Sequence, residues 1–311
     1  MIFAGFSILS SLFIGSSSMS VSQVLDVLLR EGSSLHQTLV FELRLPRALI
    51  AFATGAMLSI AGVLMQVLLR NPLADPYVLG VSGGASLAAL LAMLMGLETT
   101  MVTGSAFIGA LVSIFAVFVL AQGRGGWTIS RLLLTGVVMA AGWGALISFT
   151  LVISPPDKVH GMLFWLMGDL SYDRPLGPGL VILFVSLVLT LPLCRQLNVM
   201  SWGDKQAASL GVDVKRLRLA IFLLASLLTA GAVSLAGGIG FVGLVVPHFV
   251  RLLVGNDHRI LVPASALAGA ILLIWADILA RTAMAPLQIP VGVLTALLGV
   301  PLFLYLLRRS R

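Results

Sequence analysis

Residues 47–80 read RALIAFATGAMLSIAGVLMQVLLRNPLADPYVLG, and this stretch decides the fold. No charged residue lies between Arg47 and Arg70, so the run is long enough to cross a bilayer as a helix, which takes about 20 apolar residues. A short polar loop with Pro72 and Pro76 follows it. Proline cannot continue a helix and it restricts the residue before it, so the two prolines predict a rigid, non-helical connection.

The composition of the whole chain indicates a membrane protein. Of the 311 residues, 59% are hydrophobic and 10% are charged, and the mean hydropathy is +1.09. Soluble domains carry about 25% charged residues. A chain this apolar cannot bury all of its hydrophobic surface in a soluble core. We therefore expect an all-α integral membrane protein in which residues 1–311 form a single transmembrane domain.

Hydrophobic runs predict about ten membrane-spanning helices. Residues 22–45 and 155–174 are more polar and are expected outside the membrane, the second with a short amphipathic helix. The run at 241–254 is short and contains Pro247, which predicts a broken or tilted helix. An even number of spans places both termini on one side. The expected spans are residues 2–20, 47–69, 80–96, 102–121, 130–153, 176–195, 216–235, 241–254, 262–281 and 291–307.

The distribution of positive charge predicts which side that is. Thirteen of the 19 lysines and arginines fall on segments that share a side with the C-terminus, and six fall on the other side. Lys and Arg are enriched on the cytoplasmic side of membrane proteins, so both termini and the RNPLADP loop are predicted to be cytoplasmic. The basic residues lie in short segments between apolar runs, so the net charge of +7 does not indicate a nucleic-acid partner.

The sequence offers no energy source of its own. A GxxxxGK[ST] phosphate-binding loop is absent, because none of the three lysines follows a glycine. An ion-coupled secondary transporter keeps ionisable groups within the membrane, and this class remains the alternative. The only acid well inside an apolar run is Asp277, with Arg281 one turn further on. The two form either an ion pair on the helix surface, near its outer end, or part of a coupling site.

Covalent chemistry is not expected. Neither paired carboxylates, nor a Ser/Lys pair, nor an HExxH motif occurs within the predicted spans, so an enzyme is disfavoured and no cofactor or metal site is predicted. The single cysteine, Cys194, excludes an internal disulfide and is interpreted as a small apolar filler.

The longest segment on the predicted cytoplasmic side is residues 198–218, NVMSWGDKQAASLGVDVKRLR. Within it, GDKQAASLGV predicts a short helix that starts near Asp204, where the carboxylate complements the helix dipole, and stops at Gly211. The small residues between these two would give the helix a narrow face, and Leu210 would form an apolar knob. The residues alone leave two interpretations open: a solvated connector, or a knob that fits a groove on a cytoplasmic partner.

Several segments carry a resemblance to a known family. They are LRLPRALIAFATGAMLSIAGVLMQVLLRNPLADPYVLGVSGGAS, SRLLLTGVVMAAG, MLFWLMGDLS, GDKQAASLGV, GGIGFVGLVVPHFVRLLVGNDHRILVPASALAGA, ADILAR and IPVGVLTALLGVPLFLYLL. Together they resemble the permease subunits of the iron-siderophore, haem and cobalamin family of ABC importers, the FecCD type. They follow the family order over nearly the whole chain, from about residue 40 to residue 307.

The resemblance implies the fold and the partners. It implies the permease fold of type II ABC importers, with ten helices in the inner membrane. It also implies a second permease copy, most simply in a homodimer, two separate ATP-binding subunits and a periplasmic substrate-binding protein. The expected function is import of a bulky metal chelate, either a ferric siderophore, cobalamin or haem. The permease would hydrolyse no ATP itself.

The resemblance also implies roles for individual residues. The coupling segment, about residues 198–216, would insert into the ATP-binding subunit through Gly203, Asp204, Ala207, Leu210 and Gly211. The cytoplasmic gate would form where two loops meet across the dimer, at Asn71, Leu73, Ile129 and Ser130. Arginines on the outer face would receive acidic residues of the binding protein, at Arg44, Arg47 and Arg281.

Two features of the resemblance qualify these roles. Ile129 stands where the cobalamin permease has threonine, which makes the gate slightly more apolar and weakens an assignment to cobalamin. His248 follows Pro247 in a motif that the family carries with different cargoes, so we interpret it as a structural hydrogen-bonding residue rather than a haem or metal ligand. His160 and His258 are expected to be solvated loop residues.

Overall fold

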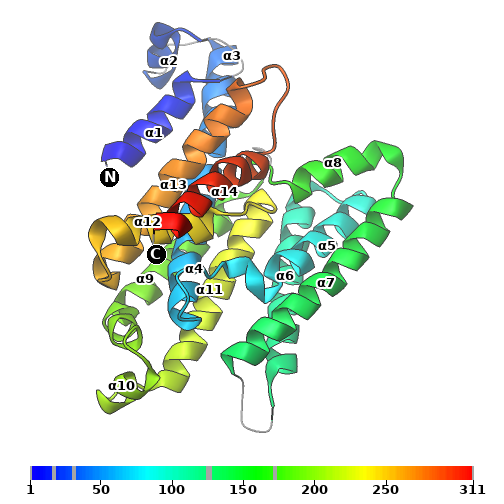
Figure 1. Ribbon diagram of the computed structural model, residues 1–311. Coiled ribbons are helices and arrows are strands. Elements are labelled where there is room, and N and C mark those ends of the chain that lie inside the picture. Colours follow the sequence, from blue (N-terminus) through cyan, green and yellow to red (C-terminus); the bar gives the residue numbers. More distant parts are fainter. Residues whose placement is uncertain (1, 16–18, 30–32, 124–127, 171–173, 310–311) are drawn as a thin grey trace.

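The computed structural model describes residues 2–15, 19–29, 33–123, 128–170 and 174–309, whose regular elements are helices (Figure 1). The structure confirms the all-α prediction in this part of the chain. In chain order the elements are α1 (Ile2–Phe13), α2 (Val21–Leu28), α3 (Ser34–Gln37), the π-helical turn η1 (Thr38–Arg44), α4 (Leu45–Leu68), the 3-10 turn η2 (Pro76–Leu79), α5 (Val81–Leu94), α6 (Thr99–Ala121), α7 (Ile129–Ile153), α8 (Pro156–Leu166), α9 (Leu176–Met200), α10 (Asp204–Ser209), α11 (Val214–Ala236), α12 (Val242–Val254), α13 (His258–Thr282) and α14 (Val291–Arg309).

Each of the ten expected spans overlaps one helix of the structure. Six of the helical segments are long and apolar enough to cross a membrane, namely residues 34–68, α6, α7, α9, α11 and α13. Four further apolar helices, α1, α5, α12 and α14, are shorter. The amphipathic helix expected within residues 155–174 is α8. The number of crossings and the side of the termini stay predictions.

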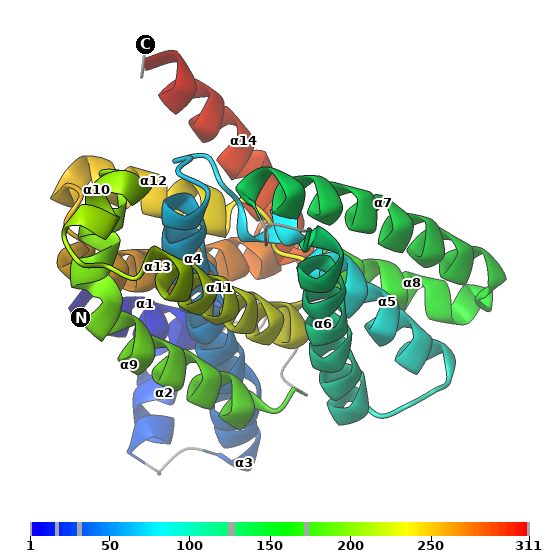
Figure 2. The ribbon, with the colours of Figure 1, turned by 90° about the horizontal axis from the view of Figure 1, so that it is seen from below.

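Helix α4, which contains the apolar run after Arg47, is the centre of the fold. It packs against α9, α11, α12 and α13, and Figure 2 shows it surrounded by them. The approach is close because glycines face each other: a Cβ on Gly55 would overlap the backbone of Gly269, and one on Gly62 would overlap the carbonyl of Gly243. Small residues let helices pack closely where lipid supplies no hydrophobic drive for association.

The outer helices differ sharply from α4. In the most apolar stretch of the segment that contains α4, 89% of the residues are buried, whereas the figure for α7 is 11%. Leu134, Val137 and Val138 of α7 are exposed and recur at the spacing of one helix face. Apolar surface of this kind needs lipid or a second protein to cover it.

Candidate functional site

The loop that joins α4 to η2, residues 70–75, is here called the gate loop, and its own side chains hold its shape. Asn71 Oδ1 accepts the backbone N–H of Leu73 at 2.9 Å. Asp75 Oδ1 accepts the N–H of Tyr77 at 2.7 Å and so caps η2. Asn and Asp side chains stabilise turns in this way. Arg70 adopts a left-handed backbone with φ of 50°, so the chain turns sharply where α4 ends.

The far end of the gate loop is anchored in the subunit. The hydroxyl of Tyr77 accepts the N–H of Ile239 at 3.3 Å. Burial raises the pKa of Tyr77, and the neighbouring Asp75 raises it further. Burial also raises the pKa of Asp75, against the lowering effect of the Tyr77 N–H. Turn η2 packs on α7, where any side chain on Gly136 would overlap the carbonyl of Val78. The loop is therefore rigid at both of its ends, as the two prolines predict.

The four predicted gate residues lie in two places. Asn71 is exposed and Leu73 is half-buried on the gate loop, whereas Ile129 is half-buried and Ser130 is exposed at the start of α7. Within the described part of this single chain, no hydrogen bond joins the first pair to the second. The gate loop leads into η2, and η2 contacts α7, so the two pairs lie on segments that are connected through this contact. Their meeting across a dimer stays a prediction.

The predicted short helix of the coupling segment exists as α10, at the lower end of the molecule in Figure 1. Gly203 and Gly211, which flank it, have φ of 119° and 83°, conformations that favour glycine. Leu210 is 62% exposed and forms the expected knob. Ala207 is completely buried, so this side of α10 packs against the rest of its own chain.

Asp204 connects the coupling segment to the gate loop. Its carboxylate forms ion pairs with Arg70, which begins the gate loop, and with Arg218 of α11. The sequence predicts that Asp204 complements the helix dipole and belongs to the coupling site, but it does not predict that Asp204 pairs with Arg70. The pairing joins residues far apart in the chain, and no local pattern in the sequence indicates it.

The three predicted docking arginines converge at the opposite end of the bundle. Arg44 and Arg281 are each 5% exposed, so they lie inside the subunit. Arg44 Nη1 donates to the carbonyl of Leu12 at 2.6 Å, and Arg281 Nη2 donates to Ser11 Oγ at 3.0 Å, so α1 covers both. Arg47 is more accessible, and its Nη1 donates to Gln288 Oε1 at 3.3 Å.

Asp277 holds two of these arginines. Its carboxylate lies 2.8 Å from Arg47 Nε and 2.9 Å from Arg281 Nε. The expected pair with Arg281 exists, but the interpretation as a helix-surface pair is wrong, because Asp277 is 1% exposed. Removing one partner from such a buried cluster would leave an uncompensated charge, which is strongly destabilising.

The histidines differ from their predictions at two positions. His258 is 2% exposed rather than solvated, and its backbone N–H and ring Nδ1–H both donate to Asn198 Oδ1. His248 Nδ1 has no partner in the described part of the chain, so its predicted hydrogen bonding is not found at this nitrogen. His160 is exposed, as expected, but it lies on α8 rather than in a loop. Among the described residues, no three His, Cys, Asp or Glu side chains could hold a metal ion together.

The sequence model of the FecCD transport family matches residues 3–309, almost the entire chain. The chain belongs to the FecCD transport family.

Curated relatives of this FecCD chain are permease subunits. It is 44% identical over 278 residues to the cobalamin import system permease protein BtuC of Halobacterium salinarum, covering 88% of this chain and 74% of the relative. It is 43% identical over 283 residues to the Fe(3+) dicitrate transport system permease protein FecD of Escherichia coli K12, covering 89% of this chain and 87% of the relative. These relatives confirm the prediction of an ABC importer permease that is not itself an enzyme.

A solved structure supports the fold of the FecCD chain. A chain from an inward-facing structure of a metal-chelate type ABC transporter superposes with a TM-score of 0.89 at 32% identity. The superposition covers 99% of this chain and 97% of that one. The helices described above therefore have the arrangement of a type II importer permease, and the protein is a multi-pass membrane protein.

Proposed function

We propose that this permease is the translocating subunit of an ATP-driven importer that carries a bulky metal chelate across the inner membrane. It works as a homodimer with two ATP-binding subunits and a periplasmic substrate-binding protein, and both of its termini are cytoplasmic. The observation that carries the proposal is the match to the FecCD family over residues 3–309, and the coupling route is the Arg70–Asp204 ion pair. Through it, a movement of the exposed knob at Leu210 reaches the gate loop directly.

The gate and the dimer follow from the same arrangement. The exposed apolar face of α7 begins beside Ile129 and Ser130, so a second copy that covers this face brings two sets of gate residues together. The cytoplasmic mouth then closes where Asn71 and Leu73 meet Ile129 and Ser130 across the dimer. Closure of the ATP-binding subunits on ATP shifts α10 and resets this contact.

The cargo is a metal chelate, as the names of the relatives indicate: a cobalamin permease and a ferric dicitrate permease are 44% and 43% identical to this chain. Docking of the binding protein falls to Arg47, since its two neighbours are buried under α1. Capture of the cognate binding protein should weaken in Arg47→Gln, which removes the positive charge that attracts acidic residues without placing a second carboxylate beside Asp277. Unchanged capture would reject the assignment.

Leu210→Asp tests the coupling proposal. A carboxylate on the knob would be buried in a groove of the ATP-binding subunit without a partner, at a cost of several kcal/mol. Uptake into vesicles that contain the whole complex should fall at least about tenfold, since about 1.4 kcal/mol already gives that factor. Leu210→Met keeps the volume and apolar character and should transport normally. Equal uptake by the two variants would contradict the assignment of Leu210 to the contact with the ATP-binding subunit. Uptake by wild type without ATP would instead favour an ion-coupled carrier.

A further inference from the structure

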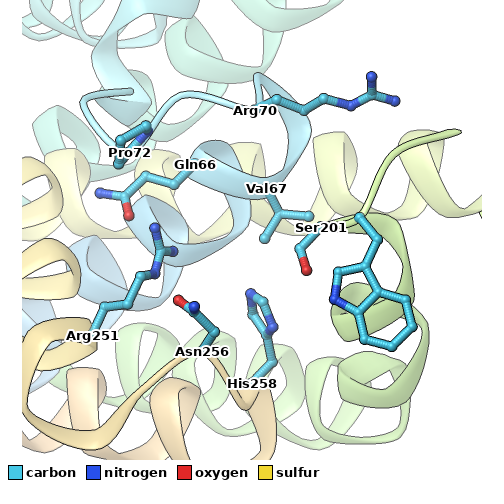
Figure 3. A pocket seen from close by; sticks show the side chains of 9 residues that line it. Gln66, Val67, Arg70, Pro72, Ser201, Arg251, Asn256 and His258 are labelled. Atoms are coloured by element: carbon cyan, nitrogen blue, oxygen red, sulfur yellow. The ribbon is translucent and has the colours of Figure 1, made fainter.

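A cavity of about 340 Å³ opens beside the gate loop and the coupling segment (Figure 3). Its volume falls within the range of small-ligand sites, about 300–1,000 Å³. Three regions supply its walls: the end of α4 with the gate loop, the residues between α9 and α10, and the last turn of α12 with the connection to α13 and its first residue. The lining residues are Gln66, Val67, Arg70, Pro72, Ser201, Trp202, Arg251, Asn256 and His258.

Gln66 leaves one hydrogen-bond acceptor free at this cavity. It is 3% exposed, and its Nε2 donates to the carbonyl of Leu244 at 3.2 Å. That bond fixes the orientation of the amide and leaves Oε1 without a partner in the described part of the chain. A buried amide oxygen without a donor costs free energy, so a ligand or water that supplies an N–H or O–H is favoured there.

His258 leaves a second acceptor. The Nδ2 of Asn198 donates to Asp257 Oδ1 at 2.8 Å, so the other amide atom of Asn198 is the oxygen. This oxygen lies 2.6 Å from His258 Nδ1, which must therefore carry the ring hydrogen. The Nε2 of the neutral ring is left as a lone pair, and it has no partner among the described residues.

Arg251 supplies positive charge to the same space. Figure 3 shows its side chain reaching from α12 toward Gln66, with Asn256 and His258 beside it. It forms no ion pair with any described residue, whereas Arg70 at the rim is paired with Asp204. The cavity thus presents one unpaired guanidinium and two buried acceptors.

We propose that this cavity binds a phosphate group that carries a hydroxyl donor. The anionic oxygens accept from Arg251, and the hydroxyl hydrogen satisfies Gln66 Oε1 or His258 Nε2. A carboxylate side chain from a partner fits less well, since it brings no donor for either acceptor. Hydrogen phosphate has the required chemistry, and so does the headgroup of phosphatidylglycerol, with its phosphate and glycerol hydroxyls.

Calorimetric titration of the full chain in detergent tests the site. Inorganic phosphate should bind saturably. Sulfate, which has no hydroxyl at neutral pH, should bind at least about tenfold more weakly, because it leaves both acceptors unsatisfied where hydrogen phosphate satisfies one. Arg251→Gln should weaken phosphate binding by about tenfold or more through loss of a charged hydrogen bond. Arg259→Gln is the matched control, since Arg259 is exposed on the next helix and does not line the cavity.

A second variant guards against a folding defect. Asn256 is exposed at the cavity, so Asn256→Asp adds a repelling charge without disturbing the core, and it should also weaken phosphate binding. Nanodiscs distinguish the sources: phosphatidylglycerol should raise the melting temperature over phosphatidylcholine alone in wild type but not in Arg251→Gln if a lipid is bound. Saturable binding of phosphate alone assigns a free anion. No effect of either ligand, or equal effects in wild type and Arg251→Gln, would overturn the proposal.

Discussion

An aspartate shared by two arginines occurs at both ends of the helix bundle, and the two arrangements differ in burial. The side chain of Asp277, under α1, is 1% exposed, whereas that of Asp204, on α10, is 31% exposed. The chemistry of the two clusters is the same, with one carboxylate between two guanidinium groups. The surrounding solvent is therefore what separates their roles.

Burial determines whether such a cluster can open. Separating the charges around Asp277 would leave ions in a medium that solvates them poorly, which costs several kcal/mol for each ion. The pairs of Asp204 are partly exposed, so water can solvate the charges when the pairs break. Exposed pairs contribute about 0.2–1 kcal/mol. The end with Asp277 is thus a clamp, and the end with Asp204 is a link that costs little free energy to open.

Removal of the clamp should have the largest effect. Asp277→Ala leaves Arg47 and Arg281 without their shared carboxylate, and we expect a loss of about 3–5 kcal/mol in unfolding free energy. Unfolding of the purified chain in detergent, followed by tryptophan fluorescence, measures it. Adding Arg281→Met should restore part of the loss, because an apolar side chain of similar length needs no counter-charge. A loss below about 1 kcal/mol in the single variant would contradict the clamp.

Removal of the link should affect transport more than stability. Asp204→Asn keeps the shape of the side chain and removes its charge, so stability should change by less than about 1 kcal/mol. Uptake per ATP hydrolysed should fall by up to about fivefold, the factor that 1 kcal/mol gives.

A double-mutant cycle with Arg70→Gln provides the control for the link. If the ion pair transmits the movement, the two single changes and the double change should reduce uptake by similar amounts. Independent, additive losses would show that Asp204 and Arg70 act separately. High salt should reduce the difference in uptake between wild type and the variants, since ions screen a pair that is partly exposed to solvent.

The sequence predicted the parts of this comparison that are local. The ten apolar runs became helices because length and composition determine them, and α10 begins at Asp204 and ends before Gly211 because charge and glycine act within one turn. The NPLADP loop is rigid for the reason its prolines indicate. The family resemblance then supplied the partners and the expected sites.

The sequence did not predict what depends on distant segments. Asp277 is buried because α1, more than 260 residues earlier in the chain, covers its arginine. His258 is buried because Asn198, 60 residues away, accepts its ring hydrogen. The Arg70–Asp204 pair likewise depends on how α9, α10 and α4 pack. Periodicity and charge distribution carry no signal for such contacts.

Asp213 extends the comparison to a more exposed pair and should show the smallest effect. It pairs with Arg216 at 3.0 Å, and their side chains are 54% and 90% exposed. Arg216→Ala should change the unfolding free energy by less than about 0.5 kcal/mol, since water solvates the carboxylate of Asp213 once the guanidinium is removed.

Asp213 also caps α11 by accepting the N–H of Arg216 at 3.0 Å, so its own substitutions separate charge from hydrogen bond. Asp213→Asn keeps the cap and should be as stable as wild type, whereas Asp213→Ala should lose about 1 kcal/mol. Detergent unfolding of the three variants measures both. If Asp213→Asn lost as much unfolding free energy as Asp213→Ala, the charge of Asp213 would be stabilising even though the side chain is exposed. Burial alone would then not explain the difference between the clamp at Asp277 and the link at Asp204.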